Sequence, residues 1–187
     1  MLLKALDDCR VYDKVWQGDL FRVASIDRAN EDDLISGQGS KLWGQRWNPP
    51  GLFRTVYFSL NVTTAVEEAL AQSRRQGLPD SQALPLVLTS AFVKLTAIVD
   101  LSDVRVRSVL GAYLDRMLRE PHDPGPESVS QAFGRIAFSQ NYQGLLVPSA
   151  AVSGHFNLVI FPESLSPGQL RVTHADRLPS KAGKGPG

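Results

Sequence analysis

The sequence predicts an α+β fold: a single compact domain whose mixed, mostly antiparallel β core is flanked by helices. The chain of 187 residues suits one domain. Its 43% hydrophobic and 21% charged residues are typical of a protein with a buried core. Strand-like and helix-like segments are both present, but they do not alternate in the regular β-α-β order that would indicate a doubly wound sheet.

Local patterns place the expected elements along the chain. β-branched and aromatic segments predict strands over 15–25, 55–59, 84–95, 96–101, 144–149 and 157–162. Helices are expected over 61–77, 103–119 and 128–140. Loops are expected at the polar segment 27–42 and the proline-rich segment 120–127. We expect one domain over 1–175, followed by a polar tail over 176–187.

Charge and cysteine content exclude several classes of protein. With 20 basic and 19 acidic side chains, the net charge of +1 argues against direct binding of nucleic acid or of an anionic membrane. Cys9 is the single cysteine, so no internal disulfide is expected. No apolar run approaches the ~18 residues of a membrane span, and Asp7 and Asp8 interrupt any signal peptide. These features predict a cytoplasmic protein.

Neither a metal site nor a dinucleotide fingerprint is predicted. The three histidines are scattered without the spacing of metal ligands. The segment GQGS at 37–40 has two glycines, but Leu42 occupies the place of the third glycine of the fingerprint.

Two arginines are candidates for binding an anion. Arg22 lies in the apolar strand segment LFRVA, where an unpaired guanidinium is costly, so it needs either an internal salt bridge or a bound anion. Arg46 lies in WGQRWNPPG, residues 43–51, whose prolines and glycines predict a stiff turn that holds the guanidinium toward a phosphate or carboxylate. The alternative is that Trp43 and Trp47 cover an edge of the core while Arg46 lies in solvent.

The segment TVYFS, residues 55–59, has two distinct faces. Period-two alternation places Thr55, Tyr57 and Ser59 on one face and two apolar side chains on the other. The first face is typical of a small-molecule pocket, although one solvated face is equally common in strands.

The helix that follows carries two adjacent glutamates, which flank its apolar arc on opposite edges. We expect Asn61 or Thr64 to cap this helix and Gly77 to end it. Thr64 and Glu67 also fit a capping box, which would give Glu67 a structural role and leave Glu68 for a ligand.

Polar residues near the last two strands complete the set of candidates. Ser149 follows a strand and a proline, where a serine is a turn former more often than a catalytic group. Asn157 begins the next strand, and its side chain can form hydrogen bonds across the gap between the two strands.

Together these motifs resemble the RES domain family, named for an Arg, a Glu and a Ser. The resemblance spans about residues 20–162 and rests on Phe21-Arg22, Gly37, Gly39, GQRWNPPG (44–51), Tyr57, Ser59, AVEE (65–68), Pro148-Ser149-Ala150 and Asn157. Two departures are Gln45, where the family has a second glycine, and Val23, where some members have a tyrosine.

The resemblance implies an ADP-ribosyltransferase-like fold of the diphtheria-toxin type and the toxin of a RES–Xre toxin–antitoxin pair. NAD would be the substrate, with no bound cofactor, and its nicotinamide–ribose bond would be cleaved by hydrolysis or phosphorolysis. The implied catalytic residues are Glu68, Arg22 and Ser149, and the implied NAD-binding residues are Arg22, Arg46, Tyr57, Ser59, Asn48 and Asn157.

The implied partner is an Xre-like helix-turn-helix antitoxin, through which any operator contact would be made. A homodimer stays an open alternative. Two other functions also stay open: an ADP-ribosyltransferase that modifies a protein, and a non-catalytic regulatory module that binds a partner.

Overall fold

The computed structural model describes residues 2–75, 77–82, 85–119 and 125–175. Over these residues, one six-stranded sheet is covered by helices. The strands are β1 (Lys14–Ser25), β2 (Val56–Ser59), β3 (Leu86–Asp100), β4 (Gly144–Pro148), β5 (Phe156–Ile160) and β6 (Leu170–Thr173). The helices are α1 (Leu2–Cys9), α2 (Glu31–Ser36), α3 (Gln38–Trp43), α4 (Val62–Arg75), α5 (Val104–Leu110), α6 (Ala112–Arg119) and α7 (Val129–Ser139).

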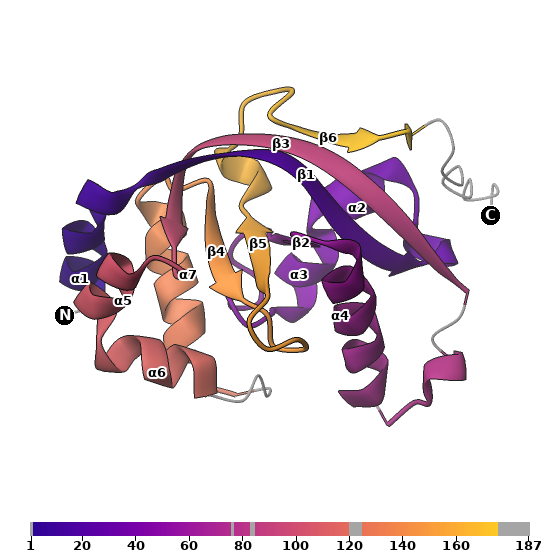
Figure 1. Cartoon of the computed structure of the whole chain (residues 1–187), viewed down its shortest axis with the longest axis horizontal. Helices are drawn as coiled ribbons and strands as arrows, with labels where there is room; N and C mark the ends of the chain where they lie inside the picture. Colours follow the sequence, from indigo (N-terminus) through magenta and orange to yellow (C-terminus); the bar gives the residue numbers. More distant parts are fainter. Residues whose placement is uncertain (1, 76, 83–84, 120–124, 176–187) are drawn as a thin grey trace.

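The sheet closes on itself because β3 pairs with β1, the first strand in the order, as well as with β4 and β6. The strand order is β1-β2-β5-β4-β3-β6, and β1 also pairs with β3 along most of its length. Figure 1 shows β1 and β3 arching over β4, β5 and β2. The β3–β4 pair is parallel and the other pairs are antiparallel. The predicted α+β class, with a mixed and mostly antiparallel sheet flanked by helices, is therefore confirmed.

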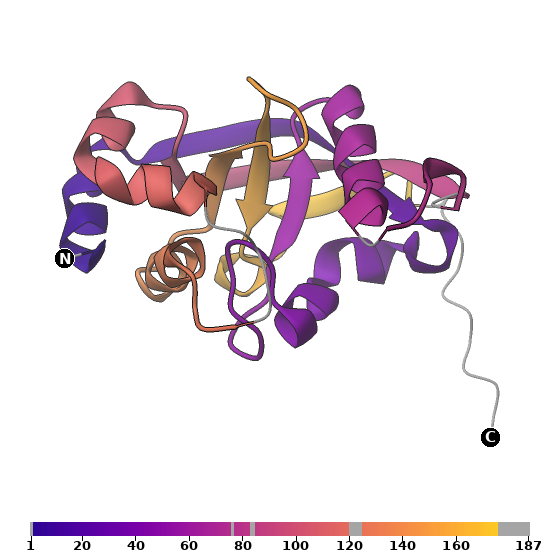
Figure 2. The same cartoon turned by 90° about the horizontal axis from the view of Figure 1, so that it is seen from below.

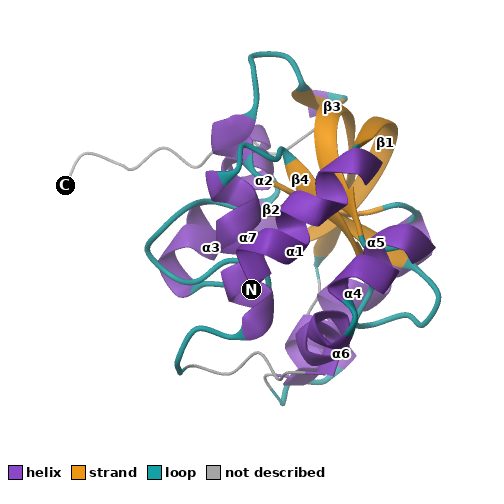
Figure 3. Ribbon diagram, turned by 90° about the vertical axis from the view of Figure 1, so that its left-hand side faces the viewer, coloured by secondary structure: helices purple, strands orange, loops and turns teal. Residues whose placement is uncertain are grey.

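The two faces of the central strands pack into separate cores. One core lies between β4, β5 and the helices α1, α5, α6 and α7, and it includes Trp47, Phe133 and Phe161. The other core is enclosed by β1, β2, β3 and β5 and includes Phe58 and Leu158. Figure 2 shows α6 and α7 to one side of the central strands and α4 to the other. Figure 3 shows α1 and α7 in front of the strands. Most residues of β2, β4 and β5 are therefore buried.

The segment 27–42 is not the predicted loop, because it contains α2 and α3. Asn30 caps α2: its Oδ1 accepts a hydrogen bond from the Asp33 amide at 3.1 Å. Gly37, with φ of +65°, ends α2 and begins α3. The acidic residues that made the segment look like a loop occupy the first turn of α2, where they complement the helix dipole.

Three other element boundaries differ from the prediction. The two strands predicted over 84–101 are one strand, β3, because its apolar alternation continues without a turn. The helix predicted over 103–119 is two helices, separated at Gly111 with φ of +49°. The strand β6 follows the two strands that were expected to be last. The predicted tail at 176–187 and part of the proline-rich loop at 120–127 lie outside the described residues.

Candidate active site

The N-terminus of α4 is fixed by Asn61. Its Oδ1 accepts a hydrogen bond from the Thr64 backbone amide at 2.9 Å and lies at the same distance from Thr64 Oγ1. The predicted capping box of Thr64 and Glu67 is wrong, because Thr64 lies inside the helix. Glu67 instead forms an ion pair with Arg74 at 3.2 Å, both side chains being well exposed. Gly77 follows the helix with φ of +73°, and its amide donates to the Arg74 carbonyl, as expected for a helix end.

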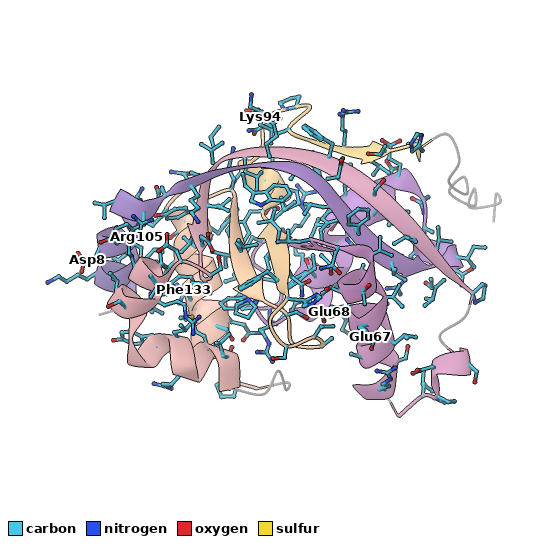
Figure 4. All side chains as sticks on the ribbon, in the orientation of Figure 1. Asp8, Glu67, Glu68, Lys94, Arg105 and Phe133 are labelled. Carbon is cyan, nitrogen blue, oxygen red and sulfur yellow. The ribbon has the colours of Figure 1, made fainter. Side chains whose placement is uncertain are left out.

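Glu68 is held by two residues that come from the other end of the chain. Its Oε1 accepts hydrogen bonds from Ser149 Oγ and from Asn157 Nδ2, each at 2.6 Å. Figure 4 shows Glu68 on the side of α4 that is nearer the central strands, and Glu67 farther out. Among the described residues, no donor contacts Glu68 Oε2. One carboxylate oxygen is therefore fixed by the protein, and the other is available to a ligand hydroxyl.

Ser149 uses its whole hydrogen-bonding capacity within the protein. Its hydroxyl donates to Glu68, and its Oγ accepts from the amides of Ala151 at 3.2 Å and Val152 at 3.0 Å. A hydroxyl has one donor and two acceptor positions, so none remains for a ligand. The sequence left two alternatives for Ser149, a turn former or a residue of the active site. In the structure it forms a turn and also contacts the candidate catalytic group.

Asn157 links Glu68 to the sheet. Residues Ser59 of β2 and Asn157 of β5 are directly paired in the antiparallel ladder, and Ser59 Oγ donates to Asn157 Oδ1 at 2.8 Å. Both side chains are buried. Because Asn157 accepts from Ser59, its amide nitrogen is directed toward Glu68.

Tyr57 lies on the same face of β2 as Ser59. It packs against the first core, whereas Val56 and Phe58 belong to the second, as the period-two pattern predicts. The Tyr57 hydroxyl oxygen accepts a hydrogen bond from the Trp47 amide at 3.1 Å. Burial raises the pKa of Tyr57 well above its ordinary value; the Trp47 amide and the charge of Arg46 oppose this shift, while the charge of Glu68 adds to it. Tyr57 is therefore a neutral side chain that feels the charges of both Arg46 and Glu68.

The segment 43–51 forms the predicted stiff turn. The backbones of Gln45 and Asn48 bond to each other in both directions, at 2.9 and 3.2 Å. Asn48 is fully buried: its Nδ2 donates to the Ser40 carbonyl, and its Oδ1 accepts from Thr55 Oγ1. Gly44 has φ of +70°, and a Cβ there would come within 2.9 Å of Pro50 Cδ. Asn48 is thus a brace of the turn.

The two tryptophans of this turn have opposite environments. Trp47 is 2% exposed, whereas Trp43 is 75% exposed and does not cover the core. Gly134 of α7 packs directly on the backbone of Trp47, since a Cβ on this glycine would lie 1.8 Å from the Trp47 carbonyl oxygen. Gln45 does not have a positive φ, so this position does not require glycine. Its carbonyl accepts from Gln131 Nε2 at 3.2 Å, which ties the turn to α7.

Arg46 extends from this turn and, among the described residues, forms one hydrogen bond, from Nη1 to the Leu118 carbonyl of α6 at 3.2 Å. Within the described part of the chain, no carboxylate forms an ion pair with it. Its charge is therefore not neutralised by these residues.

Arg22 lies on β1, beside the pairing of Phe21 with Ser59. Its Nη1 donates to the Leu34 carbonyl of α2 at 2.8 Å, and burial lowers its pKa to about 10. The internal salt bridge considered for Arg22 is not present among the described residues. No hydrogen bond joins Arg22 to the Glu68 cluster, and strand alternation places its side chain on the opposite face from Phe21. Arg22 is an uncompensated cation near the cluster but separate from it.

The structure therefore joins Glu68, Ser149, Asn157 and Ser59 by direct hydrogen bonds, with Tyr57 and Arg46 nearby. Sequence reasoning missed His155, whose Nδ1 lies 2.6 Å from Thr64 Oγ1. A lone histidine in a loop carries no signal of this contact. In the described ranges, no group of His, Cys, Asp and Glu side chains has the arrangement of a metal site. In the same ranges, no helix combines the length and apolarity that crossing a membrane requires.

The fold and this cluster define the class of protein. The RES domain model matches residues 19–180, so the chain belongs to the RES domain family. Two similar proteins, from Mycobacterium tuberculosis and Mycobacterium bovis, are named NAD(+) phosphorylase MbcT. Each is 27% identical to this chain over 161 residues, which cover 84% of this chain and 80% of the relative.

A solved structure that contains a protein named MbcT is also similar to this chain. It is the crystal structure of the M. tuberculosis MbcT–MbcA toxin–antitoxin complex, with a TM-score of 0.74 and 25% sequence identity. The alignment covers 92% of this chain and 89% of the matched chain.

Proposed function

We propose that this protein is the toxin of a toxin–antitoxin pair and depletes NAD by cleaving its nicotinamide–ribose bond. Membership of the RES family and the similarity to proteins named NAD(+) phosphorylase support this proposal. The structural observation that carries it is the state of Glu68. Its Oε1 is held at 2.6 Å by Ser149 and Asn157, while Oε2 has no partner among the described residues.

Glu68 is the proposed catalytic residue. Cleavage breaks the bond between the ribose carbon and nicotinamide, which leaves with the electron pair as a neutral molecule. The ribose then develops an oxocarbenium-like positive charge. A carboxylate fixed in advance stabilises that charge without reorganising during the reaction. The unshared Oε2 is placed to accept a hydrogen bond from a ribose hydroxyl and to face the developing charge.

The other residues have supporting roles in this proposal. Asn157 and Ser149 orient Glu68, and Ser59 orients Asn157. Ser149 is thus assigned to positioning, because its hydroxyl has no capacity left for NAD. We assign Tyr57 to stacking on the nicotinamide ring. Asn48 braces the turn that presents Arg46 and does not contact the substrate.

Arg46 is proposed to bind the pyrophosphate of NAD. Arg22, whose side chain leaves β1 on the face opposite to Phe21, is proposed to contact the same pyrophosphate from that side. Neither forms an ion pair with a described carboxylate, and each retains guanidinium N–H groups beyond its single bond to a backbone carbonyl. A guanidinium fork matches the geometry of phosphate oxygens. Binding of two negative charges would compensate the desolvation that lowers the pKa of Arg22.

Inorganic phosphate is the proposed acceptor. Its oxygen would bond to the ribose carbon and form a phosphorylated ADP-ribose, whereas water would give ADP-ribose and a proton. We infer that an Xre-like antitoxin controls this activity in the cytoplasm, where the antitoxin would also make any contact with DNA. A homodimer is compatible with this proposal.

The test is NAD consumption by purified, antitoxin-free protein, with and without inorganic phosphate. We expect NAD loss that requires phosphate and a phosphorylated ADP-ribose product identified by mass spectrometry. Phosphate-independent loss would assign hydrolysis instead. Label transferred from NAD to a protein band would assign ADP-ribosylation. Unchanged NAD with no labelled protein would contradict the enzymatic proposal and favour a regulatory module that binds a partner.

A further inference from the structure

The loop between β4 and β5 is closed by hydrogen bonds of its own. The amide of Ser149 donates to the His155 carbonyl at 2.8 Å, which joins the two ends of the loop. Inside it, the His155 amide donates to the Val152 carbonyl, and two further amides donate to Ser149 Oγ. The loop therefore behaves as one unit, and fixing one end also restrains the other.

Helix α4 contacts both ends of this loop. Glu68 accepts from Ser149 at 2.6 Å, and Thr64 Oγ1 lies 2.6 Å from His155 Nδ1. Thr64 and Glu68 are four residues apart, so their side chains lie on the same face of the helix, one turn from each other. Thr64 is fully buried. The four side chains and the backbone bond between Ser149 and His155 form a closed ring, of which the candidate catalytic carboxylate is a member.

The contacts of His155 define its tautomer. Its Nδ1 lies 3.2 Å from Asn61 Nδ2, and an amide nitrogen can only donate. Asn61 cannot turn its oxygen toward the ring, because Asn61 Oδ1 already accepts from the Thr64 amide at the start of α4. Nδ1 is therefore an acceptor. The Thr64 hydroxyl has one proton, which goes to His155 Nδ1 at 2.6 Å and not to Asn61 Oδ1 at 2.9 Å, and the proton of the neutral ring lies on Nε2.

We propose that His155 is a positioning residue for Glu68. By accepting at Nδ1, it fixes the far end of the β4–β5 loop to the first turn of α4. This contact keeps Ser149 in register with Glu68 one turn further along the helix. The effect on catalysis rests on the proposed function, whereas the tautomer and the restraint of the loop do not.

The test compares two substitutions that differ in where they place an acceptor. In His155→Asn the side-chain oxygen can occupy the place of Nδ1, while in His155→Gln the amide reaches the place of Nε2 and leaves Nδ1 without a substitute. We expect His155→Gln to lower kcat for NAD cleavage about tenfold to a hundredfold with little change in KM, since a small displacement of a catalytic group has a cost of this size. His155→Asn should stay close to wild type.

Two further variants complete the set. Thr64→Val keeps the shape of the side chain but removes the hydroxyl, so its kcat should fall as in His155→Gln. His174→Gln is the matched control, because His174 is exposed at the end of β6 and has no recorded contact with the cluster. An equal fall in His155→Asn and His155→Gln, or unchanged kcat in His155→Gln, would overturn the proposal.

A second measurement is independent of catalysis. The ¹⁵N shifts of the His155 ring, assigned by their loss in His155→Asn, should show the proton on Nε2. Exchange of the Ala151 and Val152 amides should become faster in His155→Gln and not in His155→Asn. A proton on Nδ1, or amide exchange equal to wild type in His155→Gln, would refute the role of His155. A wild-type protein that does not consume NAD, but gives the expected shifts and exchange, would refute the proposed function and leave the linkage supported.

Discussion

Glu68 and Ser149 are 81 residues apart in the sequence, and their side chains meet at 2.6 Å. The same Glu68 oxygen accepts a hydrogen bond from Asn157, which lies 89 residues after Glu68 in the sequence. Two donors on one oxygen leave the second oxygen unshared among the described residues. This asymmetry distinguishes Glu68 from its neighbour Glu67, whose carboxylate is paired with an exposed arginine.

The first prediction concerns the charge of Glu68. Glu68→Gln keeps an oxygen that can accept from Ser149 and Asn157, but it removes the negative charge. We expect kcat for NAD cleavage to fall about 10²- to 10³-fold with the melting temperature nearly unchanged. Glu67→Gln is the matched control and should retain wild-type activity. Full activity in Glu68→Gln would remove Glu68 from its proposed role.

The second prediction concerns Arg22. Arg22 has no described carboxylate beside it, so Arg22→Gln removes an unpaired charge together with one hydrogen bond to the Leu34 carbonyl. We expect KM for NAD to rise about tenfold or more, since a charge-assisted hydrogen bond to phosphate is lost, while the free energy of unfolding falls by no more than about 1–3 kcal/mol, the cost of that one hydrogen bond. Arg54→Gln is the control, because Arg54 is already paired with Glu163 at 3.0 Å and its KM should not change. A large loss of stability with unchanged KM would make Arg22 a structural residue.

The third prediction concerns alkaline stability. The pKa of the partly buried Tyr57 is raised in the folded protein, so ionisation of this tyrosine favours the unfolded chain. The stability it contributes is fully present below about pH 10, the pKa of an unfolded tyrosine, and is lost as the pH rises further. Tyr57→Phe should therefore lose stability less steeply above that pH, by up to ~1.4 kcal/mol per pH unit.

Urea unfolding between about pH 8 and pH 11 measures this slope. Tyr142→Phe should reduce it in the same direction, because burial also raises the pKa of Tyr142. Cys9, whose pKa is raised to about 11 by burial, and Arg22 also titrate in this range. Both are present in the wild type and in the variants, so they do not account for a difference in slope between them. Identical slopes in wild type and Tyr57→Phe would show that Tyr57 is not protected from ionisation.

The fourth prediction concerns the contact between α7 and the turn at 43–51. In Gly134→Ala, the new Cβ would lie 1.8 Å from the Trp47 carbonyl oxygen, so the helix or the turn must move. We expect a loss of about 1–3 kcal/mol in the free energy of unfolding, together with reduced NAD cleavage, because the same turn carries Arg46.

Gly39→Ala is the matched control for Gly134→Ala. Gly39 lies inside α3, and a Cβ there would meet no atom within 4 Å. This substitution should stabilise the protein by about 0.5–1 kcal/mol, since alanine favours a helix over glycine. Equal melting temperatures in Gly134→Ala and wild type would exclude the close packing.

The sequence predicted the fold class and most elements because these depend on local periodicity. The strand at 55–59, the helix at 61–77 and the helix at 128–140 each agree with the structure within a few residues. The same reasoning missed α2 and α3, because they are short and polar and are joined by a glycine, Gly37. It also missed the continuity of β3, because nothing local distinguishes one long strand from two consecutive ones.

The residues of the candidate site were predicted as a set, but their connections were not. Hydrogen bonds among Glu68, Ser149 and Asn157 depend on the pairing of β2 with β5 and on the angle of α4, which a single sequence does not encode locally. For this reason the roles that we propose for Ser149 and Asn48 differ from those that the resemblance implied, and the proposed role of His155 has no counterpart in the sequence analysis. The identity of a serine or an asparagine in the sequence does not show whether its side chain forms hydrogen bonds with a ligand or with the protein.

The late position of two members of the Glu68 cluster has a consequence for synthesis on the ribosome. Glu68 emerges well before Ser149 and Asn157, so its carboxylate has neither donor until those residues have been made. β2 likewise cannot pair on that side until β5 has been made. Nascent chains and fragments that stop before residue 149 therefore carry the carboxylate without the two groups that orient it, and the cluster forms only after residue 157 has been made.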